Sequence, residues 1–468
     1  MGAASGTVLA ACIALVVKGI GALYKIPLYN LLGDEATGLY GMIFPLFAFL
    51  ICISGTGIPS ALTSMISGGY RPEKVLKKAL LVFCPIGAFL SVGLFVLSDE
   101  IAILQGEPSV SPLYKVIAPS VLAVSAISVF RGYFQGLSNM RPTAFSQLIE
   151  QASRAVIGLI AAYLLPVSAN EKAFFAVLAI TVSEFFAALY CILKFLARKK
   201  KQAKEGGVPL ANADAETIPA ESEKEVTAGL LAKYVVPLTL SSLLIPFSAL
   251  IEGFIATRTL IGMLGDTGTA YYGLYTGATE TIISLPAAVL HPIALGFLPA
   301  MVKDEKAGRR AVLLTAAGGL TAAAFVGFSP NFIISVLFSG VGNKTVLNGL
   351  LTLSAPVIFL LPLLQTFSVV MLSKGLQKTS LINNAAGSLI KILVCFLLVK
   401  IPSLNVFALP ISDICCYFVA LTLDFVCVIK YNKSVNKYKI KGRSDENDNV
   451  GGTGNGKRRA VAQSVQGD

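Results

Sequence analysis

The sequence predicts an all-α polytopic membrane protein with about twelve transmembrane helices, arranged as two six-helix lobes. Three observations support this fold class. Of the 468 residues, 55% are hydrophobic and only 14% are charged, and the mean hydropathy is +0.74. The apolar residues gather in runs that are long enough to cross a bilayer. The loops between successive runs are alternately rich and poor in Lys and Arg, as in a protein with a defined membrane topology.

The apolar runs define the elements in order. The first set covers 6–28, 39–60, 76–98, 113–133, 143–165 and 173–196, and the second covers 230–256, 271–299, 310–329, 347–372, 379–400 and 404–430. The segment 331–340 is apolar but too short to cross, so we expect it to be re-entrant or interfacial. The predicted domains are an N-terminal lobe (1–197), a cytoplasmic linker (198–228), a C-terminal lobe (229–431) and a disordered cytoplasmic tail (432–468).

Loop charges orient these helices. Basic residues cluster in alternate loops, at 71–78, 131–141, 198–204, 303–310 and 374–378, while the intervening loops contain Asp and Glu. The positive-inside rule therefore places both termini and the linker in the cytoplasm of a multi-pass plasma-membrane protein. The formal net charge of +12 lies mostly in loops and tails, which favours contact with membrane lipids and gives no basic face for a nucleic acid.

The two halves resemble each other weakly. Tyr40-Gly41 opens the second run and Tyr272-Gly273 opens the eighth. The fifth and eleventh runs align without gaps and place Arg154 opposite Lys391. Because both halves begin in the cytoplasm and have an even number of spans, the repeat is parallel, with its axis along the membrane normal.

Cations within the apolar runs are the main functional candidates. A cation at the centre of a membrane helix costs about 2.5–3.5 kcal/mol, so it normally faces water or an anion. Lys18 and Lys25 lie seven residues apart, close to two helical turns, and so share one face of the first run. We predict a cavity between the lobes whose cations bind phosphate or pyrophosphate. The predicted substrate-binding residues are Lys18, Lys25, Arg154, Arg258 and Lys391.

Acidic residues within the runs are predicted to balance this charge or to bind a coupling ion, which is left open between Na⁺ and H⁺. These residues are Glu150, Glu252 and Glu280. In the fifth run, Gln147, Glu150, Gln151 and Arg154 fall on one helical face. The sequence indicates no catalytic residue, metal site or cofactor, and so we expect no enzyme.

Several of these residues also have a purely structural explanation. Glu150 and Arg154, four positions apart, form a buried structural pair in the alternative interpretation. Lys25 can extend toward the membrane surface, and Arg258 can be a boundary residue. His291 precedes Pro292, and helix packing explains it at least as well as proton relay.

Three motifs resemble those of the stage V sporulation protein B group. The first is Ile20-Gly21-Ala22-Leu23-Tyr24-Lys25-Ile26-Pro27-Leu28, the second is Arg131-Gly132-Tyr133-Phe134-Gln135-Gly136 with the segment that follows it, and the third is Pro237-Leu238-Thr239-Leu240-Ser241-Ser242. The resemblance covers about residues 6–430 and implies the multidrug/oligosaccharidyl-lipid/polysaccharide (MOP) flippase superfamily, with a MATE-like fold. The lipid II flippases of that superfamily rely on cavity cations, and Lys18 and Lys25 occupy comparable places here.

The sequence and the resemblance together predict a flippase of a bacterial cell membrane. It would move polyprenyl-pyrophosphate-linked sugars, such as lipid II or a related polysaccharide precursor, from the inner to the outer leaflet by alternating access. A monomer is compatible with this function, and the oligomeric state stays open. One alternative is a cation-coupled multidrug exporter of the same superfamily, which would favour an acidic, aromatic cavity. The other is a membrane glycan polymerase or ligase, which would need larger outer loops than these.

Overall fold

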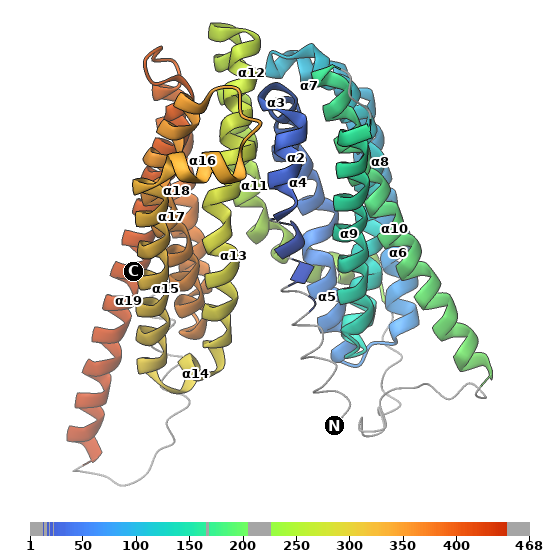
Figure 1. Cartoon of the computed structure of the whole chain (residues 1–468). Coiled ribbons are helices and arrows are strands. Elements are labelled where there is room, and N and C mark those ends of the chain that lie inside the picture. Colours follow the sequence, from blue (N-terminus) through green and yellow to red (C-terminus); the bar gives the residue numbers. More distant parts are fainter. Residues whose placement is uncertain are drawn as a thin grey trace. The chain divides into compact units, whose positions relative to one another are not determined.

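The computed structural model describes Ile13 and residues 16–17, 19–21, 23–164, 168–204 and 226–446. Helices are the sole regular element of these parts of the chain (Figure 1). The chain forms two compact units. Unit 1 comprises 1–278 and 335–344, and unit 2 comprises 279–334 and 345–468. The lobe boundary near residue 229 stays a prediction, and α11 and α12 belong to unit 1.

Unit 1 contains the N-terminal helices. Its first helices are α2 (Lys25–Leu32), α3 (Asp34–Met42), α4 (Phe44–Ile51), the π-helical turn η1 (Cys52–Thr56) and α5 (Gly57–Ser67). They are followed by α6 (Pro72–Val96), α7 (Ser98–Gln105), η2 (Pro108–Val110), α8 (Ser111–Gly136), α9 (Arg141–Leu164) and α10 (Ala169–Lys204). The unit is completed by α11 (Ala228–Leu264) and α12 (Asp266–Gly273). Helices α8, α9 and α10 pack side by side (Figure 1).

Unit 2 contains the remaining long helices. After the π-helical turn η3 (Leu274–Thr279), these are α13 (Glu280–Gly296), α14 (Leu298–Lys303), α15 (Glu305–Phe328), α17 (Lys344–Ser373), α18 (Gln377–Leu398), η4 (Asn405–Phe407) and α19 (Ala408–Glu446). The segment 331–340, which is predicted to be too short to cross, contains most of the short helix α16 (Pro330–Leu337). Helix α19 continues to Glu446, past the predicted start of the tail at 432.

Ten described helices are long and apolar enough to cross a membrane. Helix α9, with 24 residues, is about 36 Å long and could also cross. It falls outside the ten because Gln147, Glu150, Gln151 and Arg154 lower its hydropathy. Eleven of the 23 residues of the first predicted run lie outside the described residues. The prediction of an all-helical polytopic fold is therefore confirmed, and the count of about twelve spans is consistent with it.

Apolar residues cover the outer surface as well as the interior. A buried cluster in unit 1 joins Leu62 of α5, Phe83 of α6 and Tyr133 of α8. Large apolar side chains on the same helices are nevertheless exposed, for example Phe89 of α6 at 77%. A soluble protein rarely exposes apolar patches of this extent, whereas a lipid-facing surface requires them.

Two similar turns precede helices that pack against each other inside unit 1. Gly33 and Gly265 both have positive φ, and each is followed by an aspartate that begins the next helix, Asp34 in α3 and Asp266 in α12. Helices α3 and α12 then approach so closely that a Cβ on Gly273 would overlap the backbone of α3 at Asp34. Only glycine fits such a crossing.

Asp34 also anchors the chain that follows α16. Its carboxylate accepts hydrogen bonds from the backbone N–H of Gly342 at 3.0 Å and of Asn343 at 3.2 Å, and from the Tyr29 hydroxyl at 2.6 Å. Asn30 adds a bond from its amide to the Leu337 carbonyl at 2.7 Å. These contacts explain why 335–344 belongs to unit 1 although the flanking residues belong to unit 2.

Candidate functional site

Unit 1 contains a cluster of two arginines and two glutamates on three neighbouring helices. We call Arg131 of α8, Glu150 and Arg154 of α9, and Glu184 of α10 the Arg–Glu cluster. Arg131 Nη2 lies 2.8 Å from Glu150 Oε2, and Arg154 Nη2 lies 2.7 Å from Glu184 Oε1. A longer contact of 3.4 Å joins Arg154 to Glu150 Oε1, so Glu150 connects the two arginines.

Hydroxyl and amide groups complete the cluster. Arg131 Nε donates to the Ser146 hydroxyl at 2.9 Å, and Arg154 Nε donates to the Ser183 hydroxyl at 3.5 Å. The Gln151 amide donates to Glu150 Oε1 at 2.9 Å. The guanidinium groups are thereby held by several directed hydrogen bonds, which fixes their planes as well as their positions.

All four charged side chains are largely buried. Arg131 and Arg154 are 16% exposed, Glu150 is 13% exposed and Glu184 is 6% exposed. The formal charges cancel, two positive against two negative, as burial in an apolar helix bundle requires. Removing one member of such a group typically costs about 3–5 kcal/mol, since it leaves an uncompensated buried charge.

The first transmembrane segment and α3 lie beside this cluster. The hydroxyls of Tyr24 and Tyr40 are 3.3 Å apart, and both interact electrostatically with Arg154. A Cβ on Gly21 would stand 3.0 Å from Gln151 Oε1, so the first segment passes close to the polar face of α9. The cluster therefore has tyrosine hydroxyls and a glutamine as polar neighbours.

The other predicted residues of unit 1 lie apart from the cluster. Lys18 lies outside the described residues. Lys25 is exposed at the start of α2, and the exposed Arg258 donates to the Leu104 carbonyl at 3.1 Å, which ties α11 to α7. Neither forms an ion pair or hydrogen bond with the Arg–Glu cluster in the described part of the chain. Glu252 is buried in α11. The functional roles of these residues stay predictions.

Unit 2 contains a second buried ion pair. Lys391 Nζ of α18 lies 2.8 Å from Asp413 Oδ1 of α19, and the two side chains are 16% and 6% exposed. Nearby in sequence, Asp424 of α19 accepts hydrogen bonds from Asn383 at 2.8 Å and Ser380 at 3.1 Å. Glu280, the remaining predicted acid, is exposed at the start of α13.

Arg131, Glu184 and Asp413 were not among the predicted site residues, although they pair with those that were. The loop pattern predicts Arg131 in a cytoplasmic loop, but α8 continues to Gly136 and includes it. One signal was present in the sequence. A buried cation in a membrane helix needs a carboxylate on a neighbouring helix, and Glu184 and Asp413 were acids within apolar runs.

An all-helical bundle with apolar outer surfaces and buried ion pairs defines a multi-pass membrane protein. Comparison with known proteins identifies it as a transporter of the MOP superfamily. The chain belongs to the polysaccharide biosynthesis protein family, whose model matches residues 3–304.

Curated relatives come from Bacillus subtilis (strain 168). Stage V sporulation protein B is 22% identical over 422 residues, which cover 86% of this chain and 78% of that protein. The lipid II flippase MurJ is 28% identical over 165 residues, which cover 31% of this chain and 30% of MurJ. The predicted membership of the MOP superfamily is confirmed.

Solved structures show the same fold. An inward-facing multidrug resistance MATE family transporter has a TM-score of 0.66 at 16% identity, covering 91% of this chain and 99% of that one. A MOP superfamily transporter from Pyrococcus furiosus, described as having a binding pocket of reverse polarity, has a TM-score of 0.58 at 16% identity, covering 89% of this chain and 93% of that one.

Proposed function

We propose that this protein flips polyprenyl-pyrophosphate-linked sugars, such as lipid II or a related polysaccharide precursor, from the inner to the outer leaflet by alternating access. The observation that carries the proposal is the Arg–Glu cluster, in which one carboxylate, that of Glu150, is shared by two guanidinium groups. Guanidinium binds phosphate groups, such as those of pyrophosphate, through paired hydrogen bonds.

The distances suggest how an anionic headgroup would enter. Arg154 is held by Glu184 at 2.7 Å but only loosely by Glu150 at 3.4 Å, while Glu150 is held firmly by Arg131 at 2.8 Å. A phosphate oxygen can replace the loose contact to Arg154 and leave the two short ion pairs intact. The buried setting strengthens the new contact, which offsets part of the desolvation of the headgroup.

The family and the relatives support a glycan-linked substrate. The matching family model is that of polysaccharide biosynthesis proteins, and one relative is a lipid II flippase. Within the proposal, Lys18, Lys25, Arg258 and Lys391 also bind the headgroup, while Glu150, Glu252 and Glu280 balance charge or bind a coupling ion, Na⁺ or H⁺. The proposal also has the protein in the bacterial plasma membrane with both termini in the cytoplasm and without enzymatic chemistry. Its oligomeric state stays open, and a monomer is compatible with the proposal.

The test is transport by purified protein in vesicles that contain fluorescent lipid II in one leaflet. Arg154→Gln should lower the flipping rate about 10- to 100-fold, the value of a lost hydrogen bond to a charged group. Lys115→Gln is the matched control, because Lys115 forms an exposed ion pair with Asp99 in the same unit. Normal flipping by the Arg154→Gln protein would refute the proposal. Export of cationic dyes that requires Glu184, with no flipping of lipid II, would support a multidrug exporter instead.

A further inference from the structure

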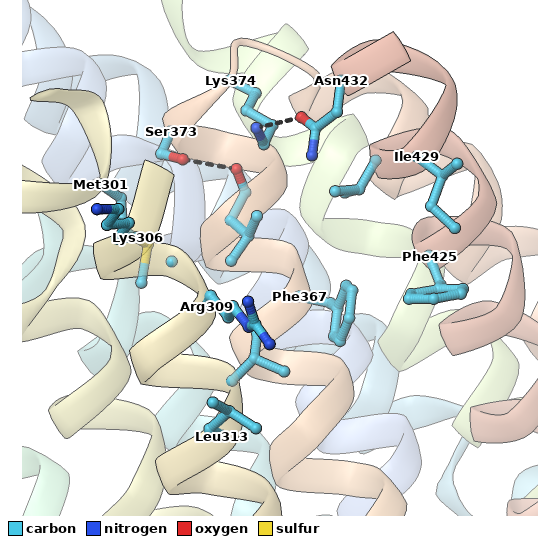
Figure 2. Close-up of a pocket in the computed structure, with 14 residues that line it drawn as sticks. Met301, Lys306, Arg309, Leu313, Phe367, Ser373, Lys374, Phe425, Ile429 and Asn432 are labelled. Atoms are coloured by element: carbon cyan, nitrogen blue, oxygen red, sulfur yellow. Dashed lines mark hydrogen bonds between the residues drawn. The ribbon is translucent and has the colours of Figure 1, made fainter. Parts of the chain in front are cut away.

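Unit 2 contains a pocket of about 480 Å³ between α14, α15, α17 and α19, separate from its buried ion pair. The volume lies within the range of small-molecule sites, about 300–1,000 Å³. Figure 2 shows Ser373, Lys374 and Asn432 at one end of the pocket and Leu313 at the other, with Arg309 and Phe367 between them. The pocket thus has a polar end and an apolar end.

Three basic residues line the polar end and the middle of the pocket. Lys306 and Arg309 come from the first turns of α15, and Lys374 directly follows α17. Lys374 is held in place by a hydrogen bond to Asn432 Oδ1 at 2.7 Å and lies over the Tyr431 ring, 5.0 Å from its centroid. No described carboxylate pairs with the side chain of Lys306 or Arg309. The described pocket lining therefore contains three basic side chains and no carboxylate.

The walls at the apolar end of the pocket are exposed on the surface of the protein. Leu313 of α15 and Phe425 of α19 are 58% and 50% exposed, and the Phe425 ring packs edge-on against Phe367 at 6.0 Å. In a membrane protein such an exposed apolar wall faces acyl chains. The basic residues belong to the loops 303–310 and 374–378, both predicted to be cytoplasmic, so the basic end lies at the membrane surface and the apolar end lies in the hydrocarbon.

We propose that this pocket binds an anionic phospholipid of the cytoplasmic leaflet, with the headgroup phosphate on Lys306, Arg309 and Lys374 and an acyl chain along Leu313 and Phe425. A zwitterionic lipid would place its own cation among three cations, and a free anion would leave the apolar wall exposed. The combination of a phosphate site with an adjoining apolar slot fits a phospholipid that carries net negative charge.

The chain contains no tryptophan, which permits a direct test. Phe425→Trp introduces a single fluorophore in the pocket wall. Phe418→Trp is the matched control, because Phe418 lies two turns earlier on α19, is 60% exposed and does not line the pocket. The full-length proteins are reconstituted in phosphatidylcholine vesicles containing small fractions of brominated phosphatidylglycerol or brominated phosphatidylcholine, whose bromines quench tryptophan on contact.

Brominated phosphatidylglycerol should quench Trp at position 425 at about five-fold lower mole fraction than brominated phosphatidylcholine, while Trp at position 418 should show no preference. Arg309→Gln should abolish the preference at position 425, and Arg310→Gln should preserve it, because Arg310 is also exposed but lies outside the pocket. Equal quenching by the two lipids at position 425, or equal effects of the two arginine variants, would overturn the proposal. Relief of quenching by inorganic phosphate, but not by chloride of equal ionic strength, would assign the site to a free anion and overturn it too.

Discussion

Arg154 of α9 and Glu184 of α10 form an ion pair with Nη2 and Oε1 2.7 Å apart, and this pair joins the two helices within unit 1. Both partners are buried, and Glu150 supplies a second carboxylate to the same guanidinium at 3.4 Å. The arginine thus has one firm partner and one loose partner. This difference is the basis of the proposal that a headgroup phosphate replaces the contact between Glu150 and Arg154. It also means that the contribution of each glutamate to stability can be measured separately.

Glu184→Gln should destabilise the protein by about 3–5 kcal/mol, because it removes a buried charge that compensates Arg154. Unfolding can be followed with a thiol-reactive dye, since Cys52, Cys191, Cys395 and Cys416 are buried and become accessible as the chain unfolds. Glu171→Gln, on the exposed first turn of α10, should change stability far less. Equal midpoints for the two variants would show that the ion pair contributes little.

The pair of Lys391 and Asp413 should behave as one energetic unit. Lys391→Met and Asp413→Leu each leave one buried charge unpaired and should each destabilise by about 3–5 kcal/mol. The double variant should lose much less than the sum of the two, because both charges are gone. Lys400→Met is the control, since Lys400 is exposed at the end of α18 over the Phe396 ring. Additive losses in the double variant would contradict the coupling.

Gly273→Ala should destabilise unit 1 by about 1–3 kcal/mol, the usual cost of overpacking, because its Cβ would overlap the α3 backbone at Asp34. Gly262→Ala in α11 is the control, because no atom lies within 4 Å of the Cβ it would add. Its effect should be neutral or stabilising, since alanine favours helix more than glycine does. The dye assay measures both variants. A tolerated alanine at position 273 would mean that α3 and α12 can separate without cost.

Asp34→Ala should release the chain after α16, because the carboxylate binds the backbone N–H groups of Gly342 and Asn343. Amide hydrogen exchange over 338–343 should accelerate by about 5- to 150-fold, which corresponds to a loss of about 1–3 kcal/mol. Asp266→Ala tests the equivalent position of the repeat, where the aspartate is exposed, and should leave this exchange unchanged. Unchanged exchange in the Asp34→Ala protein would show that other contacts hold the segment.

Much of the fold could be predicted from the sequence because hydropathy is a local property. The apolar runs from the second onward coincide with helices in the described parts of the chain, since a backbone in lipid must satisfy its own hydrogen bonds. The pairing of Glu150 with Arg154 also follows from spacing alone, because residues four apart share a helical face. The polar face of α9 could also be predicted from the sequence, from the spacing of its polar residues.

Only the tertiary structure decided which partners hold these charges. Glu150 lies closer to Arg131 of α8 than to Arg154 of its own helix, and Arg154 lies closer to Glu184 of α10. Lys391 likewise finds Asp413 on another helix. The sequence by itself determined that charged residues occur within the apolar runs and that each needs a partner of opposite charge. The choice of partner depends on how neighbouring helices rotate and pack, which long-range contacts set and which no local spacing encodes.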